Sequence, residues 1–515
     1  NRLISCLKRW SQWVPSKFQQ PTVMLHGWGA DSQIWGSFKQ SLQNYAEVYT
    51  LDLPGFGDSP TLNDYSQASL LRWMADSLPS QCNLVGLSLG GMLCRAFAAE
   101  HPKRVVSLIT ISSNLQFVAT EQYPHAMSGD SFNEFMTSWT QDSQACLKRF
   151  ASLQAQGDAQ QRQLIRTLRG IESKIDPTAG KQLLALLGDL DNRSAMAQIH
   201  CPSLAIFGQA DSLVPVNAKS QIPDSVIIQG AGHLPHLTAG DDVVLAISQF
   251  FESQRYRLDK QKVADSFGRA AERYDVAAQL QHRTGEQLLD SITLTDCPKS
   301  IVDLGCGTGY HSIQLQTRFS NSQVIGVDIS PGMLAYAKTR YPACQWLCSD
   351  AENLQLARGS QDLIFSNFTL QWCDDLSRLA AEIYRVLAIN GQLYIVVPGP
   401  QTLAELRAAW LEVDDGVHVN RFASLEQWQT AFFEAGFKTV NLQSTPEVEY
   451  HQSVRELLLE LKNIGAHNNN AGKASHLTGK RQLKALYNAY EKFRLPDGTL
   501  PASWEIISGC VVKHQ

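Results

Sequence analysis

The chain has 515 residues, of which 44% are hydrophobic and 18% are charged, and its formal net charge is −5. This length is too great for one ordinary hydrophobic core, so we expect two or more domains, and the composition argues against a mainly disordered protein. The net charge is slightly negative, so the composition gives no sign of the basic surface that nucleic-acid-binding proteins carry.

The 11 cysteines are scattered through both halves and show no Cys-x-x-Cys spacing. This pattern favours reduced thiols in a cytoplasmic compartment over disulfides or a zinc site, so no metal centre is predicted. No apolar run approaches the length of about 18 residues that a membrane-spanning helix needs. Residues 1–10 also lack the long apolar core of a signal peptide. The sequence therefore predicts a cytoplasmic protein without a membrane partner.

Strand-like and helix-like segments alternate through the first half of the chain. Such alternation predicts a mostly parallel sheet covered by helices on both faces, with functional groups at the carboxyl ends of the strands. The predicted strands are Thr22–Leu25, Tyr45–Leu51, the apolar run that begins at Leu84, Val105–Ile111, Leu204–Phe207 and Val226–Gln229.

The first half is organised around Gly86-Leu87-Ser88-Leu89-Gly90-Gly91. The glycines remove Cβ atoms that would clash in a tight strand–turn–helix, and this leaves the serine hydroxyl exposed at the start of the helix. Ser88 is therefore a candidate nucleophile. Upstream, His26-Gly27-Trp28-Gly29 forms a turn whose backbone N–H groups can point outward, which would supply half of an oxyanion hole.

Two later loops carry the partners that a nucleophilic serine needs. Asp211 follows the strand ending at Phe207, and His233 follows the small-residue loop after Gln229. The order Ser, acid, His is the order of an α/β-hydrolase. We expect His233 to take the Ser88 proton and Asp211 to hold the imidazole tautomer. The alternatives are that His236 is the base, or that the aspartate only caps a helix.

The N–H groups of Trp28 and Leu89 are expected to bind the tetrahedral oxyanion. Between Ile111 and Ile199 lies an insertion with helical content, at about residues 113–198, which is predicted to form a lid over the strand ends. Arg162 and Arg166 lie four residues apart on one helical face of it. A solvated surface helix explains these two charges equally well.

From about Pro21 to Phe251 the chain resembles the pimeloyl-[acyl-carrier protein] methyl ester carboxylesterases of biotin synthesis. The resemblance rests on the two glycine motifs, on Asp211 and on His233. It implies a serine esterase that needs no cofactor. The implied substrate-lining residues are Trp28, Ser88, Leu89, Phe150, Ala151, Ser152, Leu153, Gln154 and His233. The implied contacts with acyl carrier protein are Arg149, Arg162 and Arg166.

The apolar helix pattern ends at Phe251 and the chain becomes polar. We therefore predict a hydrolase domain at residues 1–252, a linker at 253–262 and a second domain at 263–515.

The second half begins with a predicted strand, Ser300–Leu304, that enters Gly305-Cys306-Gly307-Thr308-Gly309, followed by a helix at His311–Phe319. Glycines here let a ligand approach the backbone closely. The spacing is Gly-x-Gly-x-Gly, whereas a dinucleotide-binding unit has Gly-x-Gly-x-x-Gly. Asp328, after the next strand, could bind both hydroxyls of a ribose. This by itself permits a dinucleotide as well as another cofactor that contains a ribose.

Further strand ends follow at Cys348, Asn367 and Val397, and Asp350 stands where an adenine amino group could be recognised. Together these strand ends resemble the class I S-adenosylmethionine-dependent methyltransferases, which have a Rossmann-like α/β fold. The resemblance implies S-adenosylmethionine as the cofactor. The implied cofactor-binding residues are Asp303, Gly305, Gly307, Gly309, Asp328, Asp350, Ala351 and Asn367.

Four tracts, at residues 267–275, 368–372, 419–422 and 461–466, resemble the malonyl-[acyl-carrier protein] O-methyltransferases from about Ala264 to the C-terminus. A carboxylate acceptor is already ionised at neutral pH, so its methylation needs alignment and desolvation more than a base. Tyr274 and Arg421 are predicted to orient that carboxylate. The polar stretch His467–Lys480 is predicted to be a mobile loop near the acyl site.

Taken together, the two resemblances imply one enzyme that methylates malonyl-acyl carrier protein and later hydrolyses the methyl ester of pimeloyl-acyl carrier protein. Two alternatives stay open at this stage. One is a general carboxylesterase or carbon–carbon hydrolase fused to a quinone-type methyltransferase. The other is a carrier-protein-binding scaffold with one degenerate catalytic domain.

Overall fold

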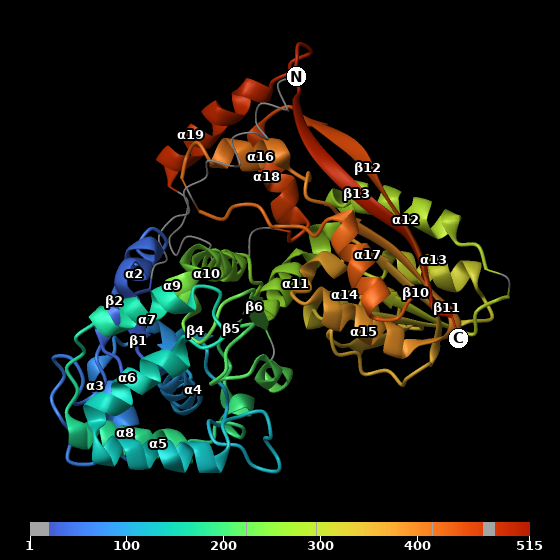
Figure 1. The fold of residues 1–515 in the computed structure, drawn as a ribbon. Coiled ribbons are helices and arrows are strands. Elements are labelled where there is room, and N and C mark those ends of the chain that lie inside the picture. Colours follow the sequence, from blue (N-terminus) through green and yellow to red (C-terminus); the bar gives the residue numbers. More distant parts are fainter. Residues whose placement is uncertain (1–19, 223, 295, 415, 467–478, 515) are drawn as a thin grey trace. The chain divides into compact units, whose positions relative to one another are not determined.

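The computed structural model describes residues 20–222, 224–294, 296–414, 416–466 and 479–514. The chain divides into two compact units, Asn1–Ser253 and Gln254–Gln515 (Figure 1). The predicted linker, residues 253–262, holds the end of helix α10 (Gly240–Arg255) and the start of helix α11 (Lys260–Ala277). Within the described ranges, no helix combines the length and the apolar character that a membrane span requires.

A wholly parallel six-stranded sheet, in the order β2-β1-β3-β4-β5-β6, lies at the centre of the N-terminal unit. Its strands are β1 (Thr22–Leu25), β2 (Val48–Leu51), β3 (Cys82–Leu87), β4 (Val105–Ile111), β5 (Ser203–Gly208) and β6 (Ser225–Ile228). The second strand is shorter than predicted, because the N–H groups of Tyr45 and Ala46 donate to the Leu42 carbonyl and close the preceding helix.

Side chains of this sheet alternate between two cores, as the two-residue period of a strand requires. Leu84 and Leu108 face one core, whereas Val85 and Ile109 face the other. The helices outside the insertion are α2 (Gly36–Leu42), α3 (Gln67–Ser77), α4 (Leu89–Glu100), α9 (Pro235–Thr238) and α10, with short 3-10 turns at Ser32–Trp35 and Val216–Gln221; a further 3-10 turn, Ala195–Gln198, lies at the end of the insertion. Helices α3 and α4 cover the first core, and α2 and α10 cover the second.

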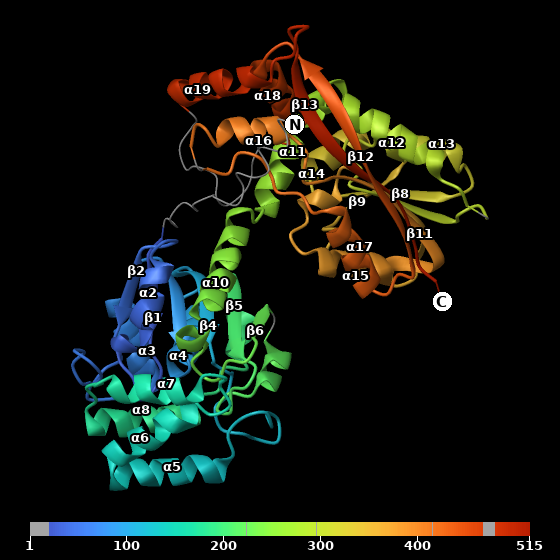
Figure 2. The same ribbon diagram turned by 45° about the horizontal axis from the view of Figure 1, so that its top comes forward.

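The insertion between β4 and β5 contains four helices, which lie together at one end of the N-terminal unit (Figure 2). They are α5 (Gly129–Gln141), α6 (Ser143–Gln154), α7 (Gln161–Gly170) and α8 (Pro177–Asp189). Local sequence sets where they begin. Asp142 caps α6 by accepting from the Ala145 N–H, and Asp176 caps α8 in the same way, with Pro177 at its first position.

The C-terminal unit has a seven-stranded sheet in the order β12-β13-β11-β10-β7-β8-β9. The five strands from β7 to β11 are parallel, whereas β13 runs antiparallel to both β11 and β12. The strands are β7 (Ser300–Leu304), β8 (Gln323–Asp328), β9 (Gln345–Cys348), β10 (Gln361–Asn367), β11 (Leu387–Pro398), β12 (Thr439–His451) and β13 (Leu500–Val512). The five parallel strands confirm the predicted order of strand ends; β12 and β13 were not predicted.

Helices cover both faces of this second sheet (Figure 1). Leu280 and Leu288 of α12 pack on one face with Ile301 and Phe365, and Ile383 of α15 packs on the other. The helices are α11, α12 (Gln279–Ser291), α13 (Tyr310–Arg318), α14 (Pro331–Arg340), α15 (Leu376–Val386), α16 (Ala404–Trp410), α17 (Leu425–Glu434), α18 (Val454–Asn463) and α19 (Lys480–Tyr490), with 3-10 turns at Leu370–Trp372 and Glu491–Phe493. Most of the predicted loop at His467–Lys480 falls in 467–478, outside the described residues.

Candidate active sites

Ser88 stands at the sharp turn between β3 and α4. Its φ of 50° and ψ of −116° lie in a region that side chains rarely adopt. The turn is possible only because small residues surround it: a Cβ atom on Gly86 would lie 2.5 Å from the Gly91 Cα, and one on Gly90 would lie 2.5 Å from the His26 carbonyl oxygen. The Ser88 N–H donates to the Ile111 carbonyl at 2.9 Å, which fixes the turn to β4.

His233 and Asp211 form a buried hydrogen-bonded pair, with 2.9 Å between His233 Nδ1 and Asp211 Oδ2. The second oxygen, Asp211 Oδ1, accepts the N–H groups of Leu213 and Val214, each at 2.9 Å. A carboxylate held in this way fixes which imidazole nitrogen carries the proton, and it leaves Nε2 as the basic atom. Ser88 and His233 line the same cavity.

His236, the alternative base, is engaged elsewhere. Its Nε2 lies 3.2 Å from the Ile34 carbonyl oxygen, and its ring packs against Trp35 and Phe38. Burial lowers the pKa of His236 to about 3, so it stays neutral near neutral pH. A neutral, packed imidazole of this kind is a core residue, and the geometry favours His233 as the base.

The two predicted oxyanion-binding residues flank the nucleophile. Trp28 is buried, its indole N–H donates to the Gly180 carbonyl of α8 at 2.8 Å, and its ring meets Phe135, Trp139 and Phe150 edge-on. Among the described residues, neither the Trp28 nor the Leu89 backbone N–H donates to an acceptor. Two such N–H groups beside the serine are what a tetrahedral oxyanion requires.

The cavity beside Ser88 is almost wholly apolar. Of the five predicted lining residues on α6, Phe150 and Leu153 line it, whereas Ala151, Ser152 and Gln154 do not. A helix presents only one side to a cavity, so five consecutive residues cannot all contribute. The remaining lining side chains were missed because they read as ordinary core positions. They are Phe117, Met127, Phe135, Leu184, Leu187 and Leu213.

The three arginines predicted to contact a carrier protein lie on the exposed surface of the insertion. Arg149 is on α6, and Arg162 and Arg166 are on α7. In the part of the chain that the structure describes, none of the three forms an ion pair with a carboxylate. Their positive charge is therefore available at the surface of the same insertion that walls the Ser88 cavity.

In the C-terminal unit the glycine loop connects β7 to α13. Gly305, Gly307 and Gly309 all have positive φ, at 78°, 52° and 84°. A Cβ atom on Gly305 would overlap the Thr369 side chain and one on Gly309 would overlap Trp346, whereas one on Gly307 would meet nothing. Packing thus explains the two outer glycines, and the middle one faces open space where a ligand can lie against the backbone.

Two aspartates stand at the ends of the strands beside this loop. Asp328 at the end of β8 accepts the Gly307 N–H at 2.9 Å and the Ser330 N–H at 2.7 Å, and burial raises the pKa of its carboxyl. Asp303 in β7 accepts the Ser312 hydroxyl, and burial raises its pKa to about 7. Asp328 therefore has a fixed orientation with lone pairs left for ligand hydroxyls.

Two other predicted cofactor residues already have protein partners. Asp350 pairs with Lys260 Nζ at 2.6 Å, and the same ammonium also binds Glu352 at 2.6 Å. The Asn367 amide donates to the Gln281 carbonyl at 2.7 Å. Ala351, between the two carboxylates, is buried. The open backbone at Gly307 and the oriented Asp328 fit the ribose end of S-adenosylmethionine, while Asp350 and Asn367 would have to share their polar atoms with it.

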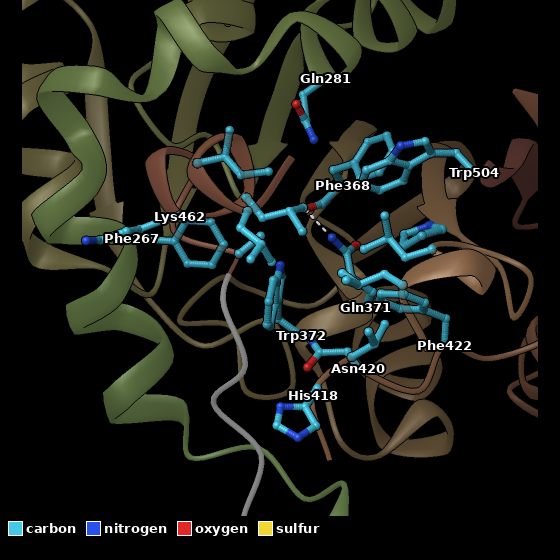
Figure 3. A pocket seen from close by; sticks show the side chains of 18 of the residues that line it. Phe267, Gln281, Phe368, Gln371, Trp372, His418, Asn420, Phe422, Lys462 and Trp504 are labelled. Atoms are coloured by element: carbon cyan, nitrogen blue, oxygen red, sulfur yellow. Dashed lines mark hydrogen bonds between the residues drawn. The ribbon is translucent and has the colours of Figure 1, made fainter. Parts of the chain in front are cut away.

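A second cavity lies near the helices α11, α16 and α18 (Figure 3). Each of the four sequence tracts that resemble the malonyl carrier-protein methyltransferases contributes to its wall. The contributors are Phe267, Tyr274, Phe368, Gln371, Trp372, Val419, Asn420, Phe422, Leu461, Lys462, Ile464 and Ala466. Segments up to about 200 residues apart in the sequence therefore meet at one cavity.

The two residues predicted to orient the acceptor differ in position. Tyr274 lines this cavity, and burial raises its pKa, so its hydroxyl stays neutral. Arg421 is exposed and does not line the cavity. Sequence reasoning missed the lining residues Gln281, Pro398, Leu403, Leu406, Trp410, His418, Leu458 and Trp504. Most are apolar and carry no motif, but His418 directly precedes the tract at residues 419–422.

The fold and the two sites define a hydrolase joined to a methyltransferase. A family model described as "alpha/beta hydrolase fold" matches residues 20–240, and one described as "Methyltransferase domain" matches residues 302–395. Both fold predictions are thereby confirmed.

Full-length relatives define the family more closely. The "Biotin biosynthesis bifunctional protein BioHC" of Cellvibrio japonicus is 40% identical, covering 94% of this chain and 97% of its own. The protein of the same name from Teredinibacter turnerae is 35% identical over 96% and 93% of the two chains. The chain therefore belongs to the family of bifunctional biotin biosynthesis proteins BioHC. The "Malonyl-[acyl-carrier protein] O-methyltransferase" of Hahella chejuensis is 40% identical, covering 51% of this chain and 94% of its own.

Proposed function

We propose that this protein methylates the free carboxylate of malonyl-acyl carrier protein in its C-terminal domain and hydrolyses the methyl ester of pimeloyl-acyl carrier protein in its N-terminal domain. The observation that carries the proposal is that one chain holds both an apolar Ser88 cavity with a His233–Asp211 pair and a glycine loop beside an acceptor cavity. Full-length similarity to a "Biotin biosynthesis bifunctional protein BioHC" and half-length similarity to a "Malonyl-[acyl-carrier protein] O-methyltransferase" support it.

In the N-terminal domain, Ser88 Oγ attacks the ester carbonyl while His233 Nε2 takes its proton. The N–H groups of Trp28 and Leu89 stabilise the oxyanion. The His233 imidazolium, held by Asp211, then gives its proton to the leaving methoxide, which departs as methanol. Water activated by His233 releases the acyl group from Ser88. The apolar lining suits a methylene chain and disfavours a free carboxylate in the same place.

In the C-terminal domain, S-adenosylmethionine supplies the methyl group when it is bound. The backbone of the glycine loop, open at Gly307, and the Asp328 carboxylate would hold that cofactor. The aromatic cavity walled by Phe267, Phe368 and Trp372 aligns the acceptor and removes water from it. The acceptor carboxylate is already ionised, so no protein base is required.

A fused enzyme must avoid hydrolysing its own first product. We propose that the surface arginines of the insertion hold the carrier protein or its phosphopantetheine arm, so that only the longer acyl chain places its ester carbonyl at Ser88. Arg149, Arg162 and Arg166 are exposed and form no ion pair with a carboxylate among the described residues, which suits this role.

Mass spectrometry of malonyl- and pimeloyl-carrier substrates with S-adenosylmethionine tests both activities in the full chain. Ser88→Ala is expected to abolish ester hydrolysis only, and Asp328→Ala is expected to impair methylation only. Equal hydrolysis rates on the malonyl and pimeloyl methyl esters would reject the chain-length argument. A wild-type protein that methylates a quinone-type acceptor in preference to malonyl-carrier would favour the alternative fusion.

A further inference from the structure

The cavity of the C-terminal domain has little positive charge for an anionic acceptor. Its described lining is mostly aromatic and aliphatic, and only two of its side chains, His418 and Lys462, can be cationic. A carboxylate placed in such surroundings without a partner would lose much of its hydration free energy. Lys462 is exposed, on the last turn of α18. His418 is largely enclosed, with its side chain 15% exposed.

His418 is held in one orientation by two contacts. Its Nε2 lies 2.6 Å from Asp414 Oδ1, and its ring stacks on the Trp410 indole with 3.6 Å between centroids and 5° between planes. Asp414 is itself fixed, because it accepts the Gly416 N–H at 2.9 Å and the Gln482 amide of α19 at 3.1 Å. An imidazolium in this place has a carboxylate on one nitrogen and an indole face against its ring.

The other ring nitrogen of His418, Nδ1, has no hydrogen-bond partner among the described residues. The residue lines the cavity, and it lies at the same side as Asn420 and Trp372 (Figure 3). The two residues predicted from the sequence cannot supply a buried charge, since Tyr274 keeps a neutral hydroxyl and Arg421 does not line the cavity.

We propose that the imidazolium of His418, held by Asp414, pairs with the free carboxylate of the methyl acceptor and selects it against acyl thioesters that lack a terminal carboxylate. This inference rests on the proposed methylation of malonyl-acyl carrier protein. One carboxylate oxygen accepts the His418 Nδ1–H, and the other stays free to accept the methyl group that bound S-adenosylmethionine would supply, with S-adenosylhomocysteine as the leaving group. Methylation removes the negative charge, so the ester product loses the ion pair and is released more readily.

The test compares three acyl groups on the same carrier protein: malonyl, malonyl methyl ester and acetyl. Binding is measured with the full chain carrying Ser88→Ala, so that the ester is not hydrolysed, and with S-adenosylhomocysteine present, so that no methyl transfer occurs. The variants are His418→Gln and Asp414→Asn. The matched control is His514→Gln, because His514 is an exposed histidine of the same domain that does not line the cavity.

The unaltered site is expected to bind the malonyl carrier more tightly than the acetyl and ester carriers. His418→Gln should weaken malonyl binding by about 10-fold or more, as expected for loss of a charge-assisted hydrogen bond, and should leave acetyl and ester binding within about 2-fold. Asp414→Asn should act in the same direction, and His514→Gln should change none of the three affinities.

Equal losses for all three carriers in both variants would overturn the proposal, because they would mean general damage to the cavity. So would unchanged malonyl binding, or an unaltered site that does not prefer malonyl to acetyl. Failure of the proposed function is recognised separately, since in that case the wild-type chain would not methylate malonyl-carrier at all in the mass spectrometric assay.

Discussion

Replacing Asp211 by asparagine changes few atoms but is expected to disable the hydrolase. Asp211 Oδ1 accepts two backbone N–H groups, of Leu213 and Val214, so the remaining oxygen of an asparagine would be held at that position. The amide NH₂ would then face His233 Nδ1, where a carboxylate oxygen now lies at 2.9 Å. A donor at that position forces the proton onto Nε2 and removes the basic lone pair that Ser88 needs.

The expected loss in kcat for ester hydrolysis is about 10⁴-fold, the effect of the same tautomer error in a serine protease triad, which corresponds to about 5 kcal/mol of transition-state stabilisation. The assay follows methanol release from pimeloyl methyl ester carrier at neutral pH. Methyl transfer by the other domain should be unchanged and serves as an internal standard for enzyme concentration, and a thermal melt checks that the N-terminal domain is folded.

Asp158→Asn is the matched control. Asp158 is also buried, and it accepts the Gly232 N–H at 2.8 Å on the loop that carries His233, but it does not bond to the imidazole. Its replacement should lower kcat by about 10-fold at most, because the His233 tautomer is not affected. The tautomer argument would be refuted by an Asp211→Asn enzyme that keeps its rate within about 10-fold of the wild type.

Three further predictions concern the insertion, the rival histidine and the serine turn. Reversing the charge of the three exposed lid arginines to glutamate should raise KM for the carrier-bound ester by about 10-fold or more without affecting a small soluble ester, and Arg72→Glu, on the exposed face of α3, should affect neither. Burial lowers the pKa of His236 from 6.5 to about 3 in the folded chain. Between these two pH values the unfolded chain binds more protons than the folded one, so stability should fall as the pH drops from 6.5 towards about 3. In urea unfolding, His236→Phe should lose that pH dependence while ester hydrolysis stays within about 10-fold of wild type; a much larger loss of activity would restore His236 as a candidate base. Gly90→Ala should destabilise the N-terminal domain by about 2 kcal/mol or more, since its Cβ would lie 2.5 Å from the His26 carbonyl oxygen, and a thermal melt with an unchanged midpoint would contradict this.

Local sequence patterns were sufficient to predict the parallel strands of both sheets. Apolar runs such as Val105–Ile111 and Ser300–Leu304 became strands at the predicted residues, because strands buried on both faces need an almost continuous apolar sequence. The edge strand β12 and its neighbour β13 were missed. Strand β12 is largely exposed and carries Pro446, Glu447 and Glu449, and a polar edge strand of this kind is specified by its partner more than by its own residues.

The chain by itself determined two chemistries, because a nucleophilic serine and a cofactor glycine loop each require particular residues over a few consecutive positions. Only the tertiary structure decided which distant side chains meet. It placed Leu184 and Phe135 beside Ser88, and it brought His418 of a loop and Lys462 of α18 to one cavity. Such contacts depend on how helices pack across many intervening residues, and no local sequence pattern records them.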